Sequence, residues 1–118
     1  MAENLMVFRM ADDLISELGA KTALLDKAIT QLGIRGRTFA QAEHDYKVAL
    51  SKRILEHRAD GMPVTIISDV CRGEPEIARL RLERDISEVV YKSALEAINS
   101  YKLQIRIMDA QIEREWSK

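Results

Sequence analysis

The sequence predicts an all-α protein: a long antiparallel helical hairpin, coiled-coil-like, with a short helical turn at its tip. Apolar residues recur at alternating spacings of three and four along two long stretches that are rich in strong helix formers. Between these stretches, residues 58–75 hold both prolines and two of the five glycines. We expect one domain, 1–118, with helix 1 at about 4–58, the tip at 59–74 and helix 2 at about 75–116.

Helix 1 is predicted to carry one continuous seam of core-facing residues. Its members are Phe8, Ala11, Ile15, Leu18, Thr22, Leu25, Ile29, Leu32, Gly36, Phe39, Glu43, Tyr46, Leu50, Arg53 and His57. A repeat of this length favours a coiled-coil helix over a compact globular one. Because each glycine inside a helix costs roughly 1 kcal/mol relative to alanine, Gly33 and Gly36 make 33–36 the candidate position for a bend or break.

The tip is predicted to be a short helical turn that plugs the open end of the hairpin. Thr65 is placed to cap this turn, and Gly73 to close it in a left-handed conformation. We expect Ile66, Ile67 and Val70 to be buried between the long helices. A connection this short favours an antiparallel pair.

Helix 2 has a clear start, because Pro75 suits the first helical position, while Glu74 and Glu76 complement the positive end of the helix dipole. Its predicted seam consists of Ile77, Leu80, Arg84, Ser87, Tyr91, Ala94, Ile98, Tyr101, Ile105, Met108 and Ile112.

A second set of apolar residues on helix 2 lies where a two-helix hairpin would leave it in water. The set consists of Leu82, Ile86, Val89, Leu103 and Ile107. Exposed apolar patches of this kind mark association, and two hairpins would form a four-helix bundle with a better core than one. We therefore predict a homo-oligomer with these residues at its interface, and leave dimer or tetramer open.

The composition argues against several classes of binding partner and location. With 18 basic and 19 acidic residues the net charge is -1, so no global field attracts nucleic acid or an anionic membrane. No apolar run approaches the roughly 20 residues that span a bilayer, and no secretory leader is recognisable. The single cysteine, Cys71, fits a reducing compartment. We expect a cytoplasmic protein without membrane contact, in the host-cell cytoplasm if the protein is phage-encoded.

The sequence contains no catalytic or phosphate-binding motif, so we predict neither an enzyme nor a cofactor. Glu43, His44 and Asp45 are consecutive helical residues that point about 100° apart, and His57 lies about 140° around the helix from His44. We therefore expect no metal site. Cys71 has two interpretations: a thiol made modestly reactive by Arg72 and a nearby helix start, or, as we favour, a semi-buried small residue of the tip.

Arginines gather at the tip and form a candidate patch for a partner or for nucleic acid. They are Arg58, Arg72, Arg79, Arg81 and Arg84. Acidic residues occupy the same end of the hairpin, so a network of internal ion pairs is the favoured interpretation. Nucleic-acid binding, where it occurs, is expected to be weak.

Three blocks of sequence carry a family resemblance: 42–50 (AEHDYKVAL), 61–65 (GMPVT) and 94–105 (ALEAINSYKLQI). Through them, about Phe39 to Trp116 resembles small helical proteins encoded in the early region of temperate phages and prophages of Gram-positive bacteria. The resemblance implies an accessory role in phage DNA metabolism, including recombination, or in countering host defence. It carries over no catalytic residue.

The predicted function is that of a non-enzymatic phage accessory protein that binds itself and an unidentified phage or host protein. Two alternatives stay open. One is nucleic-acid binding through the arginine-rich tip, which a steep loss of affinity with salt would reveal. The other is a purely structural coiled-coil oligomer with no partner beyond itself.

Overall fold

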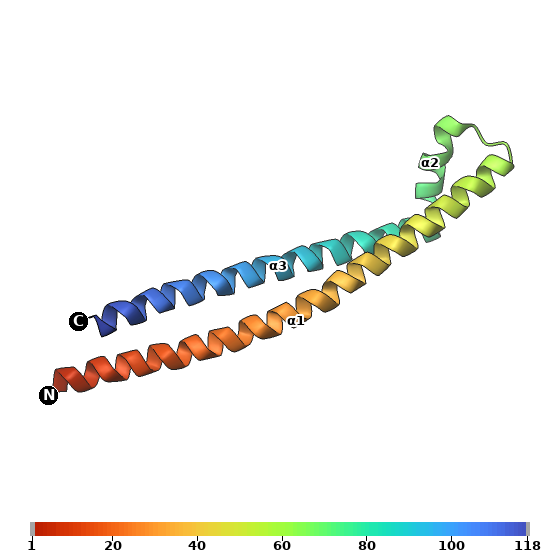
Figure 1. Ribbon diagram of the computed structural model, residues 1–118. Helices are drawn as coiled ribbons and strands as arrows, with labels where there is room; N and C mark the ends of the chain where they lie inside the picture. The colour runs from red at the N-terminus through yellow and green to blue at the C-terminus, as the bar shows by residue number, and fades with distance from the viewer. Residues whose placement is uncertain (1, 118) are drawn as a thin grey trace. The chain divides into compact units, whose positions relative to one another are not determined.

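The computed structural model describes residues 2–117, a range that contains helices and no strand (Figure 1). The elements are α1 (Ala2–Ala59), α2 (Val64–Gly73) and α3 (Pro75–Trp116). The predicted fold class, a helical hairpin with a short helical segment at its tip, is confirmed. The predicted start of helix 2 at Pro75 is also confirmed. Proline suits this position because the amide of the first helical residue has no hydrogen-bond partner within the helix.

The chain divides into two compact units. The first combines residues 1–32 with 93–118, and the second consists of residues 33–92. In the first unit, the N-terminal part of α1 packs against the C-terminal part of α3. In the second, the remainder of α1 packs with α2 and the start of α3. Within each unit the segments of α1 and α3 run antiparallel (Figure 1).

The seam of α3 lies where the sequence predicts it. Ile77, Ile98 and Met108 are buried, and the other predicted members are half-buried. On α1, Tyr46 is buried in the second unit and Ala11 is buried in the first. The core is accordingly a thin line of side chains between helices, as expected for paired helices of low aromatic content.

The predicted seam of α1 is right from Leu32 onward, and before Leu32 every second member is wrong. Ala11, Leu18 and Leu25 are buried or half-buried as predicted, whereas Phe8 is 55% exposed. Ile15 and Ile29 are 46% and 50% exposed, and their neighbours Leu14 and Ala28 are half-buried instead. Thr22 is likewise exposed, beside a half-buried lysine at 21. The observed seam therefore contains two successive spacings of four, around Leu32, and one step of this kind locally unwinds a coiled coil.

The predicted break at 33–36 does not occur, since α1 is helical through both glycines. Gly36 instead lies against an aromatic pair. A Cβ atom at Gly36 would lie 3.4 Å from Cε2 of Tyr91, and the ring centroids of Tyr91 and Phe39 are 5.9 Å apart. The boundary between the two units nevertheless falls between Leu32 and Gly33.

The turn into α2 differs from the prediction. Pro63 is the N-cap residue and makes no side-chain cap, so Thr65 does not cap the helix. Gly61, not Gly73, adopts the left-handed conformation, with φ of 86°. The physical reason is that the reversal is completed before α2 begins, by hydrogen bonds from the amides of Gly61 and Met62 to the end of α1.

The turn out of α2 is set by proline. Glu74 has extended backbone (φ -68°, ψ 137°), which is the conformation that a following proline imposes. Gly73 is the last residue of α2, and the amide of Glu74 donates to the carbonyl of Cys71. One residue therefore separates α2 from α3.

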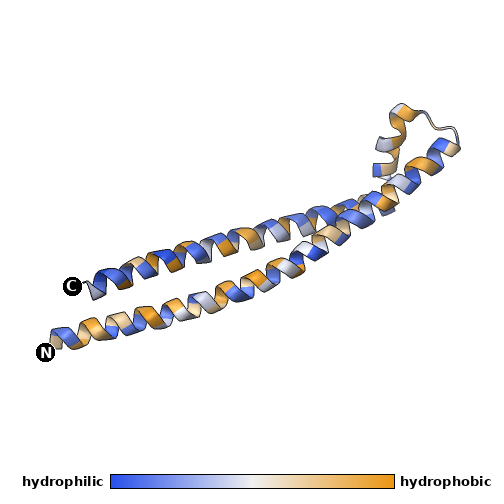
Figure 2. Cartoon of the chain, in the orientation of Figure 1, coloured by the Kyte–Doolittle hydropathy of each residue, from blue (hydrophilic) through white to orange (hydrophobic). Residues whose placement is uncertain are grey.

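Only part of the predicted apolar plug is buried. Ile67 is 2% exposed and Cys71 is completely buried, whereas Ile66 and Val70 are 46% and 39% exposed. Residues four apart share one face of a helix, so Ile67 and Cys71 both lie on the inward face of α2. Ile66 and Val70, which directly precede them, point outward. Figure 2 shows that hydrophobic residues recur along α1 and α3 between hydrophilic ones.

Candidate functional site

Four polar side chains of the second unit meet beneath α2. Arg53 and His57 lie one turn apart on the last part of α1, Cys71 comes from the inward face of α2, and Glu74 stands between α2 and α3. We call these four residues the tip cluster. Their convergence depends on the reversal at Gly61, because it folds α2 back along α1.

Glu74 is the centre of the tip cluster. The Nε of Arg53 donates a hydrogen bond of 2.9 Å to Oε2 of Glu74, and Nε2 of His57 lies 2.8 Å from Oε1. Arg53 also pairs with Glu56 on its own helix. Glu74 thus joins the junction of α2 and α3 to two residues of α1.

One nitrogen of His57 has two competing neighbours. Nε2 lies 2.8 Å from Oε1 of Glu74 and 3.0 Å from Nη2 of Arg53. A protonated Nε2 donates to the carboxylate, and an unprotonated Nε2 accepts from the guanidinium, so both hydrogen bonds cannot form at once. The proton on His57 therefore decides which partner it binds.

Burial and charge shift the pKa values of the tip cluster. Hydrogen bonds from His57 and then Arg53 hold the pKa of the Glu74 carboxyl below its usual value. Burial raises the pKa of the Cys71 thiol, and the negative charge of Glu74 raises it further. The thiol is therefore not activated by Arg72 or a helix start. Cys71 is completely buried, where the favoured interpretation expected a semi-buried residue of the tip.

His57, Cys71 and Glu74 also form a group with the donor types of a metal site. One ligand atom from each residue lies within 4.8 Å of the others. The expectation of no metal site compared His57 only with His44, along one helix, and so missed this group. His44 is an exposed residue whose Nδ1 lies 3.3 Å from Oδ1 of Asp45. His57, Cys71 and Glu74 come from α1, from α2 and from the residue between α2 and α3, so no sequence spacing reveals the group.

The arginine patch is partly consumed by ion pairs within α3. Arg79 pairs with Glu76 at 2.6 Å and with Glu83 at 2.5 Å, and Arg84 pairs with Asp85 at 2.7 Å. The hydrogen bonds to Glu76 raise the pKa of Arg79, and the hydrogen bond to Asp85 raises the pKa of Arg84. Arg79 and Arg84 are therefore already paired with acidic residues of their own helix.

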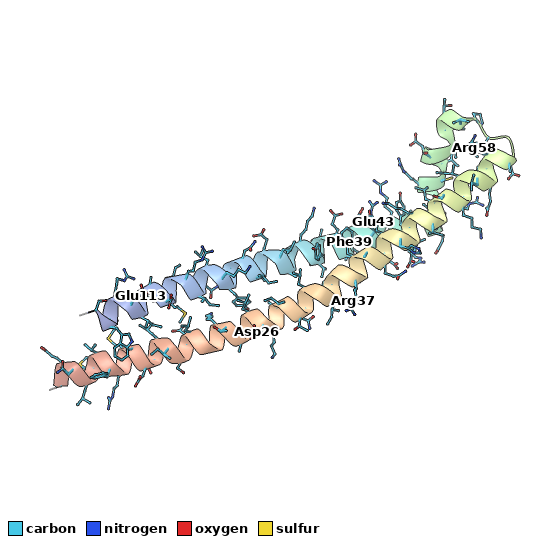
Figure 3. All side chains as sticks on the ribbon, viewed as in Figure 1. Asp26, Arg37, Phe39, Glu43, Arg58 and Glu113 are labelled. Carbon is cyan, nitrogen blue, oxygen red and sulfur yellow. The ribbon has the colours of Figure 1, made fainter. Side chains whose placement is uncertain are left out.

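The remaining arginines of the patch stay in solvent. Arg58, Arg72 and Arg81 are exposed and form no ion pair with the residues that the structure describes. Figure 3 labels Arg58 on the last turn of α1. Arg84 additionally stacks on Tyr46, with its guanidinium carbon 4.7 Å from the ring centroid. Within residues 2–117, the patch thus contributes three unpaired cations.

The second apolar set on α3 is exposed, as the sequence predicts for a single hairpin. Leu82, Ile86 and Val89 in the second unit are 59%, 54% and 64% exposed. In the first unit, Leu103 and Ile107 are 54% and 53% exposed. We call these five residues the outer stripe. The first three members are separated by four and then three residues, and Leu103 and Ile107 are separated by four.

Two open grooves between α1 and α3 begin at the outer stripe. In the second unit, Ile86 lines a groove together with Thr38, Gln41 and Ala42 of α1. In the first unit, Ile107 lines a groove with Met10 and Leu14 of α1. Each unit therefore offers an apolar side chain at the edge of a groove of its own.

Within residues 2–117, no helix combines the length and hydropathy that a membrane span requires. Comparisons with protein-family models, with curated proteins and with solved structures find no match. The resemblance to early-region phage proteins therefore stays a prediction, and the candidate sites rest on the geometry of this chain.

Proposed function

We propose that this chain is a non-enzymatic interaction protein that works as a homo-oligomer, with the outer stripe of α3 as its self-association surface. The observation that carries the proposal is the exposure of all five stripe residues, each more than half exposed. Burying a side chain of this size contributes about 1.5–3 kcal/mol. Because each stripe side chain is only a little more than half exposed, a second copy of the chain would recover roughly half of that free energy at each position that it covers.

A second copy is the occupant that fits the pattern of the outer stripe. Spacings of three and four are those with which helices pack side by side, so the complementary surface is another helix of the same kind. The grooves that Ile86 and Ile107 border would each receive such a helix. The product is a four-helix arrangement within each unit, with a thicker core than one pair of helices provides.

The wider role we propose is that of a phage accessory protein that binds a phage or host protein in DNA metabolism or in antagonism of host defence. This part rests on the resemblance of residues 39–116 alone. Direct nucleic-acid binding through the tip is the weaker alternative, because Arg79 and Arg84 are already paired with acidic neighbours. A purely structural oligomer would share the self-association and lack the further partner.

Paired charge substitutions test the self-association surface. Leu82→Glu with Ile86→Glu places two carboxylates one turn apart on the outer stripe. The matched control is Val48→Glu with Leu55→Glu on α1, at positions that are 55% and 64% exposed. For an oligomer, the thermal midpoint rises with protein concentration. We expect wild type and control to show this rise and the stripe variant to lose it. A rise of the same size in all three proteins would overturn the assignment of the surface.

A further inference from the structure

We infer that His57, Cys71 and Glu74 form a binding site for a zinc ion at the junction of the three helices. The three residues supply one imidazole nitrogen, one thiolate sulfur and one carboxylate oxygen, all within 4.8 Å of one another. Nitrogen, sulfur and oxygen donors of this kind are those with which proteins bind Zn²⁺, whereas Mg²⁺ and Ca²⁺ prefer oxygen alone.

The distances require only a small adjustment. Zinc bonds of about 2.0–2.3 Å in a tetrahedron place the ligand atoms roughly 3.3–3.6 Å apart. Nε2 of His57 and Oε1 of Glu74 are 2.8 Å apart and would separate slightly, and no two of the ligand atoms lie more than 4.8 Å apart. Cys71 is completely buried, and Glu74 and His57 are 27% and 17% exposed at their side chains. Solvent therefore reaches the three residues on the side of Glu74 and His57.

Arg53 would orient the carboxylate without occupying its ligand oxygen. Its Nε binds Oε2 of Glu74 at 2.9 Å and leaves Oε1 directed at His57. Partners that hold the free oxygen or nitrogen of a ligand are the usual supports of a metal site. The Nη2 atom of Arg53, 3.0 Å from Nε2 of His57, would yield its place to the metal.

The charges balance when the metal is bound. Zinc and the guanidinium of Arg53 carry three positive charges. The Cys71 thiolate, the Glu74 carboxylate and the Glu56 carboxylate that pairs with Arg53 carry three negative charges. Binding replaces the proton on the Cys71 sulfur with the metal and releases that proton to solvent. It also requires the neutral tautomer of His57 with its proton on Nδ1, so that Nε2 gives up its hydrogen bond to Glu74 and binds the metal. The bound site would tie α1 to α2 and to the start of α3.

The experiment uses the full chain, stripped with a chelator and titrated with Zn²⁺ or with Co²⁺ as its spectroscopic substitute. We expect one metal ion per chain, a thiolate-to-cobalt charge-transfer band and a rise in the thermal midpoint with Zn²⁺. His57→Gln and Cys71→Ser should lower the affinity by at least about tenfold, since even supporting residues contribute that much. His44→Gln, which removes the exposed histidine of the same helix, is the matched control and should bind as wild type does.

Absence of the charge-transfer band in the wild-type protein would overturn the inference. This test needs no variant, so it remains decisive even if the Cys71→Ser protein fails to fold. Binding of equal affinity in His57→Gln and wild type would also overturn it, because the metal would then lie elsewhere. All three ligands come from one chain, so the result is independent of the proposed self-association.

Discussion

Two adjacent isoleucines of α2 occupy opposite environments. Ile67 is 2% exposed against the long helices of its unit, and Ile66 is 46% exposed. The two residues are of the same type and both lie in the first turn of α2, so the local sequence does not distinguish them. Their difference arises because one helical step rotates a side chain by about 100°, and this rotation decides which residue completes the core.

Substitution by aspartate should separate the two positions. Ile67→Asp leaves an unpaired carboxylate in a buried apolar site and removes a core side chain, and we expect a loss of at least ~3 kcal/mol in the free energy of unfolding. Ile66→Asp is the matched control and should cost less than about 1 kcal/mol. Chemical denaturation followed by helical circular dichroism measures both. Equal losses would mean that α2 packs with a different face.

In the metal-free protein, the contribution of Glu74 to the stability of the fold depends on pH and is lost in acid. Its folded-state pKa is lowered, mainly by the hydrogen bond from His57, so its contribution is complete above the ordinary carboxyl value. That contribution disappears as the pH falls through the lowered pKa. We expect Glu74→Gln to reduce stability at neutral pH and to flatten its decline toward acid. Glu76→Gln, at the exposed pair with Arg79, should change this profile less; identical profiles for both variants would contradict the tip cluster as described.

At the scale of the element, α1 combines two heptad phases in one unbroken helix. The change of phase lies around Leu32, beside Gly33 and at the boundary of the two units. A helix can absorb such a change without breaking, because two successive spacings of four only shift its contact face. The change of phase therefore requires no interruption of α1 at the glycines. The glycines only lower the stability of the helix.

Alanine substitutions test the conformations of two glycines. Gly33 is helical, and a Cβ atom added there would meet no other atom within 4 Å, so Gly33→Ala should stabilise the protein by about 0.5–1 kcal/mol. Gly61 has φ of 86°, and Gly61→Ala should destabilise the protein by about 1–2 kcal/mol. Thermal unfolding of the two variants beside wild type decides the signs. Destabilisation by Gly33→Ala would indicate that α1 bends there in solution.

The elements differ in how far the sequence determines them. The ends of the long helices follow from Pro75 and from the glycine and prolines of the turn, so they are predictable. The phase of α1 before Leu32 is not, because apolar residues stand side by side at Leu14–Ile15 and Ala28–Ile29 and either could face α3. The tip cluster also escapes prediction, since its members meet only after Gly61 reverses the chain.

At the scale of the whole molecule, charge limits what the tip can bind. Near-neutral net charge removes long-range attraction, and three unpaired arginines give a salt slope of about -2.7 at roughly -0.9 per phosphate contact. Between 50 and 200 mM salt, DNA affinity should therefore fall about 40-fold. We expect no submicromolar binding of single- or double-stranded oligonucleotides at about 150 mM salt. Submicromolar binding that Arg72→Glu with Arg81→Glu abolishes would favour nucleic acid over a protein partner.

The outer stripe of α3 is the feature on which the account of the whole molecule depends. Its side chains stay more than half exposed in the hairpin, and they are spaced for contact with another helix. The most direct test is the mass of the unmodified protein by light scattering at tens of micromolar. We predict at least twice the 13.4 kDa of one chain. A mass of one chain at that concentration would contradict self-association.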